Sequence, residues 1–202
     1  MKLHSSAESQ GAQSKCPLLT SSFRMAYAHR IKTQQGENMQ RNLVGEFIEK
    51  QDDYMSSFEY GFYIASGWFN ENQAKDLECI KLILDAHGVQ YFSPKDEIIC
   101  PPDANVQTRN KIFNSNVIAI RNSAFVIVNT RDKDMGTIFE AGVAFEAKKK
   151  IIYVAFGLQG NFNLMLAESG ICVCTTPTSL DYAIGQVRAN AHWTSDYFGN
   201  IE

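Results

Sequence analysis

The sequence predicts a single Rossmann-like or flavodoxin-like α/β domain, a parallel sheet with helices on both faces, preceded by an N-terminal extension. From residue 58 onward, short apolar runs of strand length alternate with amphipathic helical patterns. Such alternation is typical of a parallel sheet covered on both sides. The length of 202 residues suits one domain and a tail, and 45% hydrophobic against 20% charged residues is a globular balance.

The region before the domain divides into two predicted parts. Residues 1–40 are rich in Ser, Gln, Lys and Asn and have weak periodicity, which predicts a flexible tail. In residues 41–57, apolar side chains recur at near-helical intervals, which predicts an added amphipathic helix. The α/β domain is therefore expected over residues 58–202.

The first half of the domain is predicted as strand, helix, strand and helix. Residues 62–65 (FYIA) read as a short buried strand, and residues 70–88 as a helix that stops at Gly88. A second strand over 89–93 ends at Pro94, and a polar loop leads to a helix over 104–121.

The second half repeats the alternation. Residues 124–129 (AFVIVN) are the clearest buried strand, and residues 136–150 are predicted as a helix whose last turn is basic, which suits the helix dipole. Strands are expected over 151–155 and 171–174, and a last helix over 179–190. In such folds ligands bind beyond the carboxyl ends of the strands, which we call the carboxyl edge.

Composition argues against several classes of function. A net charge of −3 and a pI near 5.8 disfavour a polyanionic partner, so nucleic acid is not expected. The five cysteines contain no CxxC pair, and the four histidines have no zinc-binding spacing, so we expect reduced thiols and no metal. No signal peptide and no apolar run of about 20 residues is found, so we expect no membrane and a cytoplasmic location.

Three segments follow predicted strands and should meet at the carboxyl edge: SGWFNEN, SPKDE and NTRDKDMGTIFE. None contains a glycine-rich phosphate cradle. In the third, Asp134, Gly136 and Glu140 span a loop-to-helix junction, where a helix start favours an ionised carboxylate. An ionised carboxylate suits attack on an oxocarbenium-like sugar. By spacing alone, a glutamate near a helix start is usually a solvated or dipole-favoured charge.

Three motifs together resemble the nucleoside 2-deoxyribosyltransferase family, which is related to nucleotide N-glycoside hydrolases: FYIASGWFNENQ, DMGTIFEAGVA and NFNLM. The resemblance covers roughly residues 60–175 in the same order. It implies transfer of 2-deoxyribose between nucleobases through a covalent intermediate on Glu140, with deoxynucleosides and free nucleobases as ligands. It also implies no cofactor and a homo-oligomer built from dimers, up to a hexamer.

The resemblance assigns a role to each matching residue. Glu140 matches the nucleophile, Tyr63 the tyrosine that orients it, and Asp134 an acidic residue that faces the nucleoside. Asn163 matches an asparagine that reaches a neighbouring subunit's site and binds the sugar 5′-hydroxyl. The remaining expected substrate-binding residues are Gly67, Trp68, Phe69, Asp96, Ser115, Gly136 and Met165.

One departure bears on the reaction. Ser115 stands where the family usually has an aspartate, and Ser123 falls on a second acidic position. Serine is a poor acid at neutral pH, so Asp134 or Asp96 would have to protonate the leaving base. Two alternatives stay open: an N-glycoside hydrolase of a nucleoside 5′-monophosphate, in which Ser66, Ser115 and Arg109 or Arg121 hold the phosphate, and a non-catalytic binder of a nucleotide-derived ligand.

Overall fold

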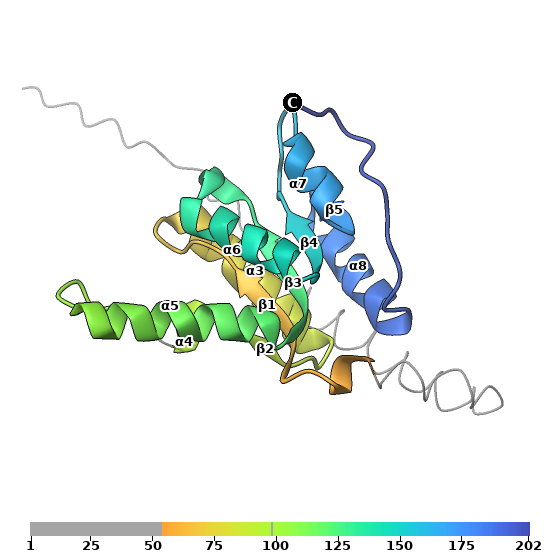
Figure 1. Cartoon of the computed structure of the whole chain (residues 1–202). Coiled ribbons are helices and arrows are strands. Elements are labelled where there is room, and N and C mark those ends of the chain that lie inside the picture. The colour runs from red at the N-terminus through yellow and green to blue at the C-terminus, as the bar shows by residue number, and fades with distance from the viewer. Residues whose placement is uncertain (1–53, 98) are drawn as a thin grey trace, which may run out of the picture.

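The computed structural model describes residues 54–97 and 99–202. They form a five-stranded parallel sheet in the order β2-β1-β3-β4-β5 (Figure 1). This order is that of flavodoxin-like folds, so the predicted fold class is confirmed. The strands are β1 (Tyr60–Ala65), β2 (Tyr91–Phe92), β3 (Ser123–Asn129), β4 (Lys150–Val154) and β5 (Cys172–Cys174). The helices are α3 (Glu71–Ala86), α4 (Pro94–Glu97), α5 (Val106–Arg121), α6 (Met135–Glu146), α7 (Leu164–Ser169) and α8 (Pro177–Ala189), with a short 3-10 turn, η2 (Arg131–Lys133).

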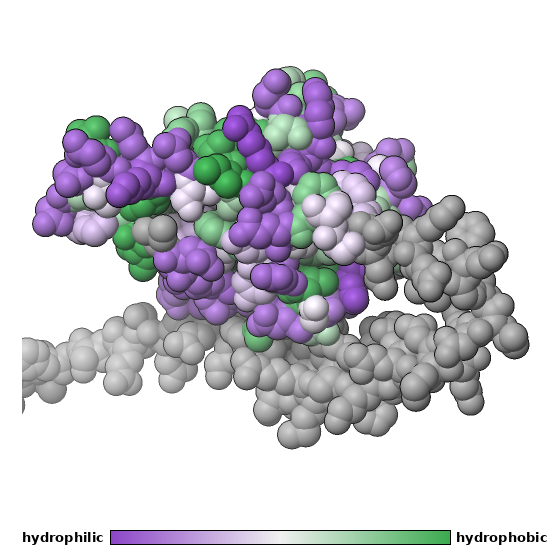
Figure 2. Space-filling view, turned by 60° about the horizontal axis from the view of Figure 1, so that its bottom comes forward, coloured by the Kyte–Doolittle hydropathy of each residue, from purple (hydrophilic) through white to green (hydrophobic). Residues whose placement is uncertain are grey.

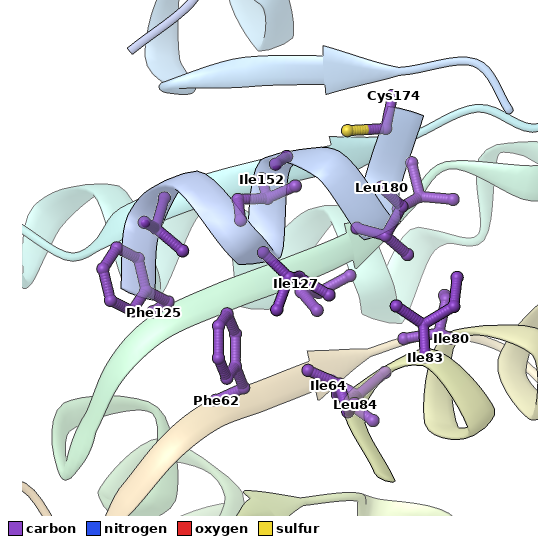
Figure 3. Close-up of a cluster of buried hydrophobic side chains, with 14 of the residues drawn as sticks. Phe62, Ile64, Ile80, Ile83, Leu84, Phe125, Ile127, Ile152, Cys174 and Leu180 are labelled. Carbon is purple, nitrogen blue, oxygen red and sulfur yellow. The ribbon is translucent and has the colours of Figure 1, made fainter. Parts of the chain in front are cut away.

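Alternation along the strands divides the core between the two faces of the sheet. Phe62 and Ile64 of β1 pack with α3 and α8 in one cluster (Figure 3). Tyr63 and Ala65, the intervening residues, pack on the other face with α5 and α6. Successive strand residues point to opposite faces, so the neighbouring rings of Phe62 and Tyr63 enter opposite layers. The Tyr63 layer also receives the side chains of α6 that face the sheet.

The helix predicted over residues 136–150 is shorter in the structure and ends at Glu146. Lys148 has a φ of 56°, in the left-handed region that stops a helix. Lys149 and Lys150 therefore lie beyond the helix, where their ammonium groups sit 4.4 Å and 4.5 Å from the ring centroids of Phe58 and Tyr54. The basic cluster thus contacts aromatic rings and does not occupy the last helical turn.

Two short helices were not expected from the sequence. The segment after the second strand, predicted as a polar loop, contains α4, and the segment around Asn163 leads directly into α7. Both are too short to show a helical hydrophobic period.

The predicted tail over residues 1–40 lies outside the described residues, as does most of the helix predicted over 41–57. Residues 54–56 are helical and pack beside the core. In the part of the chain that the structure describes, no helix is long and apolar enough to span a membrane.

Candidate active site

A buried tyrosine and a glutamate from distant parts of the chain meet at the sheet. The Tyr63 hydroxyl donates a hydrogen bond of 2.7 Å to Oε1 of Glu140. Tyr63 is fully buried in β1 and stacks on Phe92, with ring centroids 5.5 Å apart and an angle of 8°. Full burial and this stack leave the Tyr63 ring little freedom, so its hydroxyl fixes the orientation of the Glu140 carboxylate.

The surroundings of Glu140 favour its neutral form. The pKa of Glu140 is raised from 4.5 to about 7: burial is the main cause, the Tyr63 hydrogen bond lowers the pKa, and the nearby charge of Asp134 raises it. Burial and the Glu140 charge also raise the pKa of Tyr63, so the hydroxyl keeps its proton. This differs from the expectation that the helix start keeps Glu140 ionised, because Glu140 is the sixth residue of α6 and the field of a helix end fades within one turn.

Asp134 caps the helix that carries Glu140. Its Oδ2 accepts hydrogen bonds from the Thr137 backbone N–H at 2.8 Å and the Thr137 hydroxyl at 2.9 Å. Gly136 lies beside this cap, and a Cβ there would come within 3.3 Å of Asp134 Oδ2. The junction is therefore compact, and the second carboxylate oxygen of Asp134 takes no part in the capping.

The loop after β1 is held by Gln73 of α3. A Cβ on Gly67 would come within 2.9 Å of the Gln73 amide, so glycine allows this close approach. The Gln73 Oε1 accepts a hydrogen bond of 3.0 Å from the Phe69 backbone N–H. Trp68 packs partly against the core, whereas Phe69 is 72% exposed. Phe69 thus offers a free aromatic surface near the carboxyl edge.

Other predicted site residues have different surroundings. Both carboxylate oxygens of Asp96 lie 2.7–2.8 Å from Nζ of Lys81, which ties α4 to α3. Ser115 is half-buried on α5. Ser123 begins β3 at the opposite edge of the sheet, where its hydroxyl donates to the Ala119 carbonyl.

Asn163 and Met165 lie at the start of α7. The Asn163 side chain caps this helix by accepting a hydrogen bond from the Leu166 backbone N–H at 3.3 Å. Met165 is 75% exposed and lines a hollow of about 310 Å³ between α6 and α7. Among the residues described, no hydrogen bond joins either side chain to Tyr63 or Glu140, although the hollow that Met165 lines also includes Ala141, the neighbour of Glu140.

Apolar side chains are exposed around α6. Phe113 of α5 and Phe139 of α6 lie with ring centroids 5.8 Å apart, and each is more than half exposed. On the face shown in Figure 2, hydrophobic residues form separate patches among hydrophilic ones.

A polar network that sequence reasoning missed joins the loops at the carboxyl edge. Asn129, at the end of β3, donates to the Ser66 hydroxyl at 3.0 Å, and both side chains are buried. Arg131 forms two hydrogen bonds with Asp76 of α3. No short motif predicts hydrogen-bonded pairs of residues that are more than 50 positions apart, so the sequence contained no indication of this network. Within the described ranges, no group of three or more His, Cys, Asp or Glu side chains could hold a metal ion.

The flavodoxin-like sheet, with the Glu140 carboxylate hydrogen-bonded to Tyr63, defines an α/β protein of the doubly wound class, in which ligands bind beyond the carboxyl ends of the strands. Residues 62–175, more than half of the chain, match the sequence profile of the nucleoside 2-deoxyribosyltransferases. The chain belongs to this family, whose members act on N-glycosidic bonds.

Solved structures agree on the fold. A 2-deoxyribosyltransferase from Bacillus psychrosaccharolyticus is 20% identical, with a TM-score of 0.57 over 68% of this chain and 98% of that chain. A conserved protein from Enterococcus faecalis V583 is 16% identical, with a TM-score of 0.51 over 62% of this chain and 96% of that one. No protein with a curated description matches the sequence.

Proposed function

We propose that this protein transfers 2-deoxyribose from one nucleobase to another through an ester on Glu140. The observation that carries the proposal is the 2.7 Å hydrogen bond between the Tyr63 hydroxyl and Glu140 Oε1. A surface carboxylate has no need of a buried tyrosine, whereas a nucleophile must be held in one orientation. Membership of the family supports the same roles for both residues.

In the first step, ionised Glu140 attacks C1′ of the deoxynucleoside. The bond from C1′ to the base nitrogen breaks, its electron pair goes to the base, and the ring oxygen stabilises the positive charge that develops on the sugar. The Tyr63 hydroxyl holds one carboxylate oxygen, which leaves the other to attack. The product of this step is a deoxyribosyl ester of Glu140.

In the second step, a nitrogen of an incoming base attacks C1′ from the vacated side. The ester bond breaks, its electrons return to the Glu140 carboxylate, and the configuration at C1′ is restored. The proton of the incoming base is released as the new bond forms. Ping-pong kinetics follow, because the first base must leave before the second binds.

The departing base needs a proton, and Ser115 is a poor source. We assign this role to Asp134, whose Oδ1 is free of the capping bonds that hold Oδ2. Asp134 would relay a proton from solvent to the base. Lys81 occupies both oxygens of Asp96, so the proposal does not use Asp96 as the acid.

Two of the arginines are not placed to hold the 5′-phosphate of a nucleoside monophosphate, which leaves Arg109 of α5 as the arginine on which the hydrolase alternative depends. The Arg131 guanidinium lies near the first loop, but Asp76 and the Phe156 carbonyl already occupy it. Arg121 ends α5 just before β3 begins, so it lies at the edge opposite to the carboxyl edge. Neither side chain is placed to receive a 5′-phosphate at the site.

We further propose that subunits share sites. Asn163 and Met165 are exposed at the start of α7, and no hydrogen bond joins either side chain to Glu140 among the described residues. The exposed Phe113 and Phe139 offer an apolar surface nearby for a second copy. In this arrangement Trp68 and Phe69 wall the base, with Gly67 and Gly136 allowing close backbone approach, and a neighbour's Asn163 binds the sugar.

The test is incubation with deoxyinosine and free adenine, followed by chromatography for deoxyadenosine. Formation of deoxyadenosine by the wild type but not by Glu140→Gln supports the proposal. Release of free deoxyribose without exchange would identify a hydrolase. Absence of any cleavage, with the ligand bound unchanged, would identify a binder.

A further inference from the structure

The turn that leads into α6 adopts an unfavourable backbone conformation. Asp132 and Lys133 have φ values of 60° and 52°, and both are residues other than glycine in the left-handed region. Side chains with a Cβ disfavour this region, so two in succession persist only where the surroundings hold them. Asp134, the next residue, caps the helix that carries Glu140.

One guanidinium holds this turn to two other segments. Arg131 Nε and Nη2 donate to the two oxygens of Asp76 in α3 at 2.6 Å and 3.0 Å. Nη2 also donates to the Phe156 carbonyl, after β4, at 3.0 Å. Asp76 is only 8% exposed, whereas the Arg131 side chain is 30% exposed. Two-point bonds of this kind fix direction as well as distance.

Neighbouring contacts join the same two loops. Asn70 donates to Asp132 Oδ2 at 2.8 Å, and the Gln73 amide lies 3.5 Å from the Arg131 carbonyl. Gln73 also holds the backbone of Phe69. The first loop and the start of α6 are thus joined through one side of α3.

We propose that Arg131 and Asp76 are positioning residues, which set the start of α6 against the loop of Trp68 and Phe69. This inference rests on the proposed function, in which the nucleoside lies between these segments. Among the described residues, neither side chain bonds to Tyr63 or Glu140. The pair therefore acts on the reaction only through the loops that it joins.

The test compares Asp76→Asn, Arg131→Gln and the double variant, with release of nucleobase as the assay. Base release occurs in transfer and hydrolysis alike, so it serves whichever acceptor the enzyme uses. Each single variant should lose about 10- to 100-fold in kcat, since small misplacements of reacting groups have effects of this size. The loss of kcat in the double variant should be no larger than that of the worse single variant, because either change already breaks the Arg131–Asp76 ion pair, which we call the clamp.

The matched control is Asp181→Asn. Asp181 joins α8 to His87 at the end of α3, with 2.8 Å between Oδ1 and Nε2. The substitution therefore changes a side-chain contact of the same helix that lies outside the proposed positioning pair. Its kcat per folded molecule should stay within about twofold of the wild type. If Asp76→Asn does not fold, Arg131→Lys, which keeps the charge but loses the two-point bond, takes its place.

A readout of pH separates positioning from lost stability. The titratable groups that face Glu140 are Tyr63 and Asp134, and burial is the main cause of its raised pKa. A loosened α6 start admits water, lowers the pKa of Glu140 and moves the acidic limb of kcat/KM to lower pH. If Arg131 and Asp76 only stabilise the fold, the variants lower the maximum of kcat/KM and leave its acidic limb at the same pH.

Hydrogen exchange of residues 130–140 tests the clamp without activity. Asp76→Asn should speed exchange there, including at the Thr137 amide, and Asp181→Asn should not. Unchanged exchange, an unmoved limb or multiplying losses in the double variant would overturn the inference. If the wild type cleaves no nucleoside but Asp76→Asn still speeds exchange over residues 130–140, the proposed function is refuted and the positioning role of the Arg131–Asp76 pair is retained.

Discussion

Glu140→Gln should abolish turnover and make the protein more stable. The amide keeps an oxygen to accept the Tyr63 hydrogen bond, so the fold should persist, but it is a poor nucleophile. In the native protein the pKa of Glu140 is about 7 against an ordinary 4.5. A group that binds its proton more tightly in the folded state destabilises the fold once pH removes that proton.

The size and pH range of the effect follow from these two values. Below pH 4.5 the carboxyl is protonated in both states and Glu140→Gln should be nearly neutral. Between pH 4.5 and 7 the wild type loses stability relative to the variant, and above pH 7 the difference levels off. The plateau is about 3 kcal/mol at most, which corresponds to a rise in Tm of roughly 6–12 °C.

Thermal unfolding at pH 4.5, 6 and 8 measures the effect, with base exchange assayed in parallel. Glu146→Gln is the matched control, since Glu146 is an exposed residue of the same helix. It should shift Tm little at any pH. Equal stability of Glu140→Gln and wild type at pH 8 would refute the raised pKa of the Glu140 carboxyl. Retained turnover would refute the role of Glu140 as the nucleophile.

Three further predictions concern the site and its assembly. Tyr63→Phe should lower kcat/KM about 10- to 100-fold, the effect of one hydrogen bond to a charged group. The acidic limb of kcat/KM should move to higher pH, because this hydrogen bond lowers the pKa of Glu140. An unmoved limb and unchanged rates would mean that Tyr63 contributes packing alone. Deletion of residues 1–40 should preserve base exchange, because the family match begins at residue 62, and a folded but inactive truncation would show that the tail serves the site. Glu140→Ala and Asn163→Ala, each inactive alone, should regain exchange when mixed, since some sites then combine an intact Glu140 with a neighbour's intact Asn163; no recovery after demonstrated subunit exchange would show that sites are not shared.

The fold was largely predictable because its signals are local. The continuous apolar run of Phe62, Tyr63 and Ile64 predicts a strand buried on both faces, and the structure confirms it. Helix ends were less predictable: the helix predicted through Lys150 ends at Glu146, and the backbone at Lys148 is left-handed. Composition shows which residues favour a helix but not where tertiary contacts end it.

The site shows the same division. The motifs around Tyr63 and Glu140 predicted that both residues belong to one site, and the structure places them in hydrogen-bond contact. The motifs could not show that Asp134 caps α6 or that Asp96 pairs with Lys81. A carboxylate in a sequence has the same chemistry whether it is free or paired, and only the fold supplies the partner.

The sequence by itself determined the order of the strands and the longer helices, the family and the pair of residues on which the proposed reaction depends. Only the tertiary structure decided the pKa of Glu140, the strained turn at Asp132 and the clamp between Arg131 and Asp76. Secondary structure follows from the period of neighbouring side chains, which a sequence displays directly. Burial, charge and pairing depend on residues that are distant along the chain, and these come together only when the chain folds.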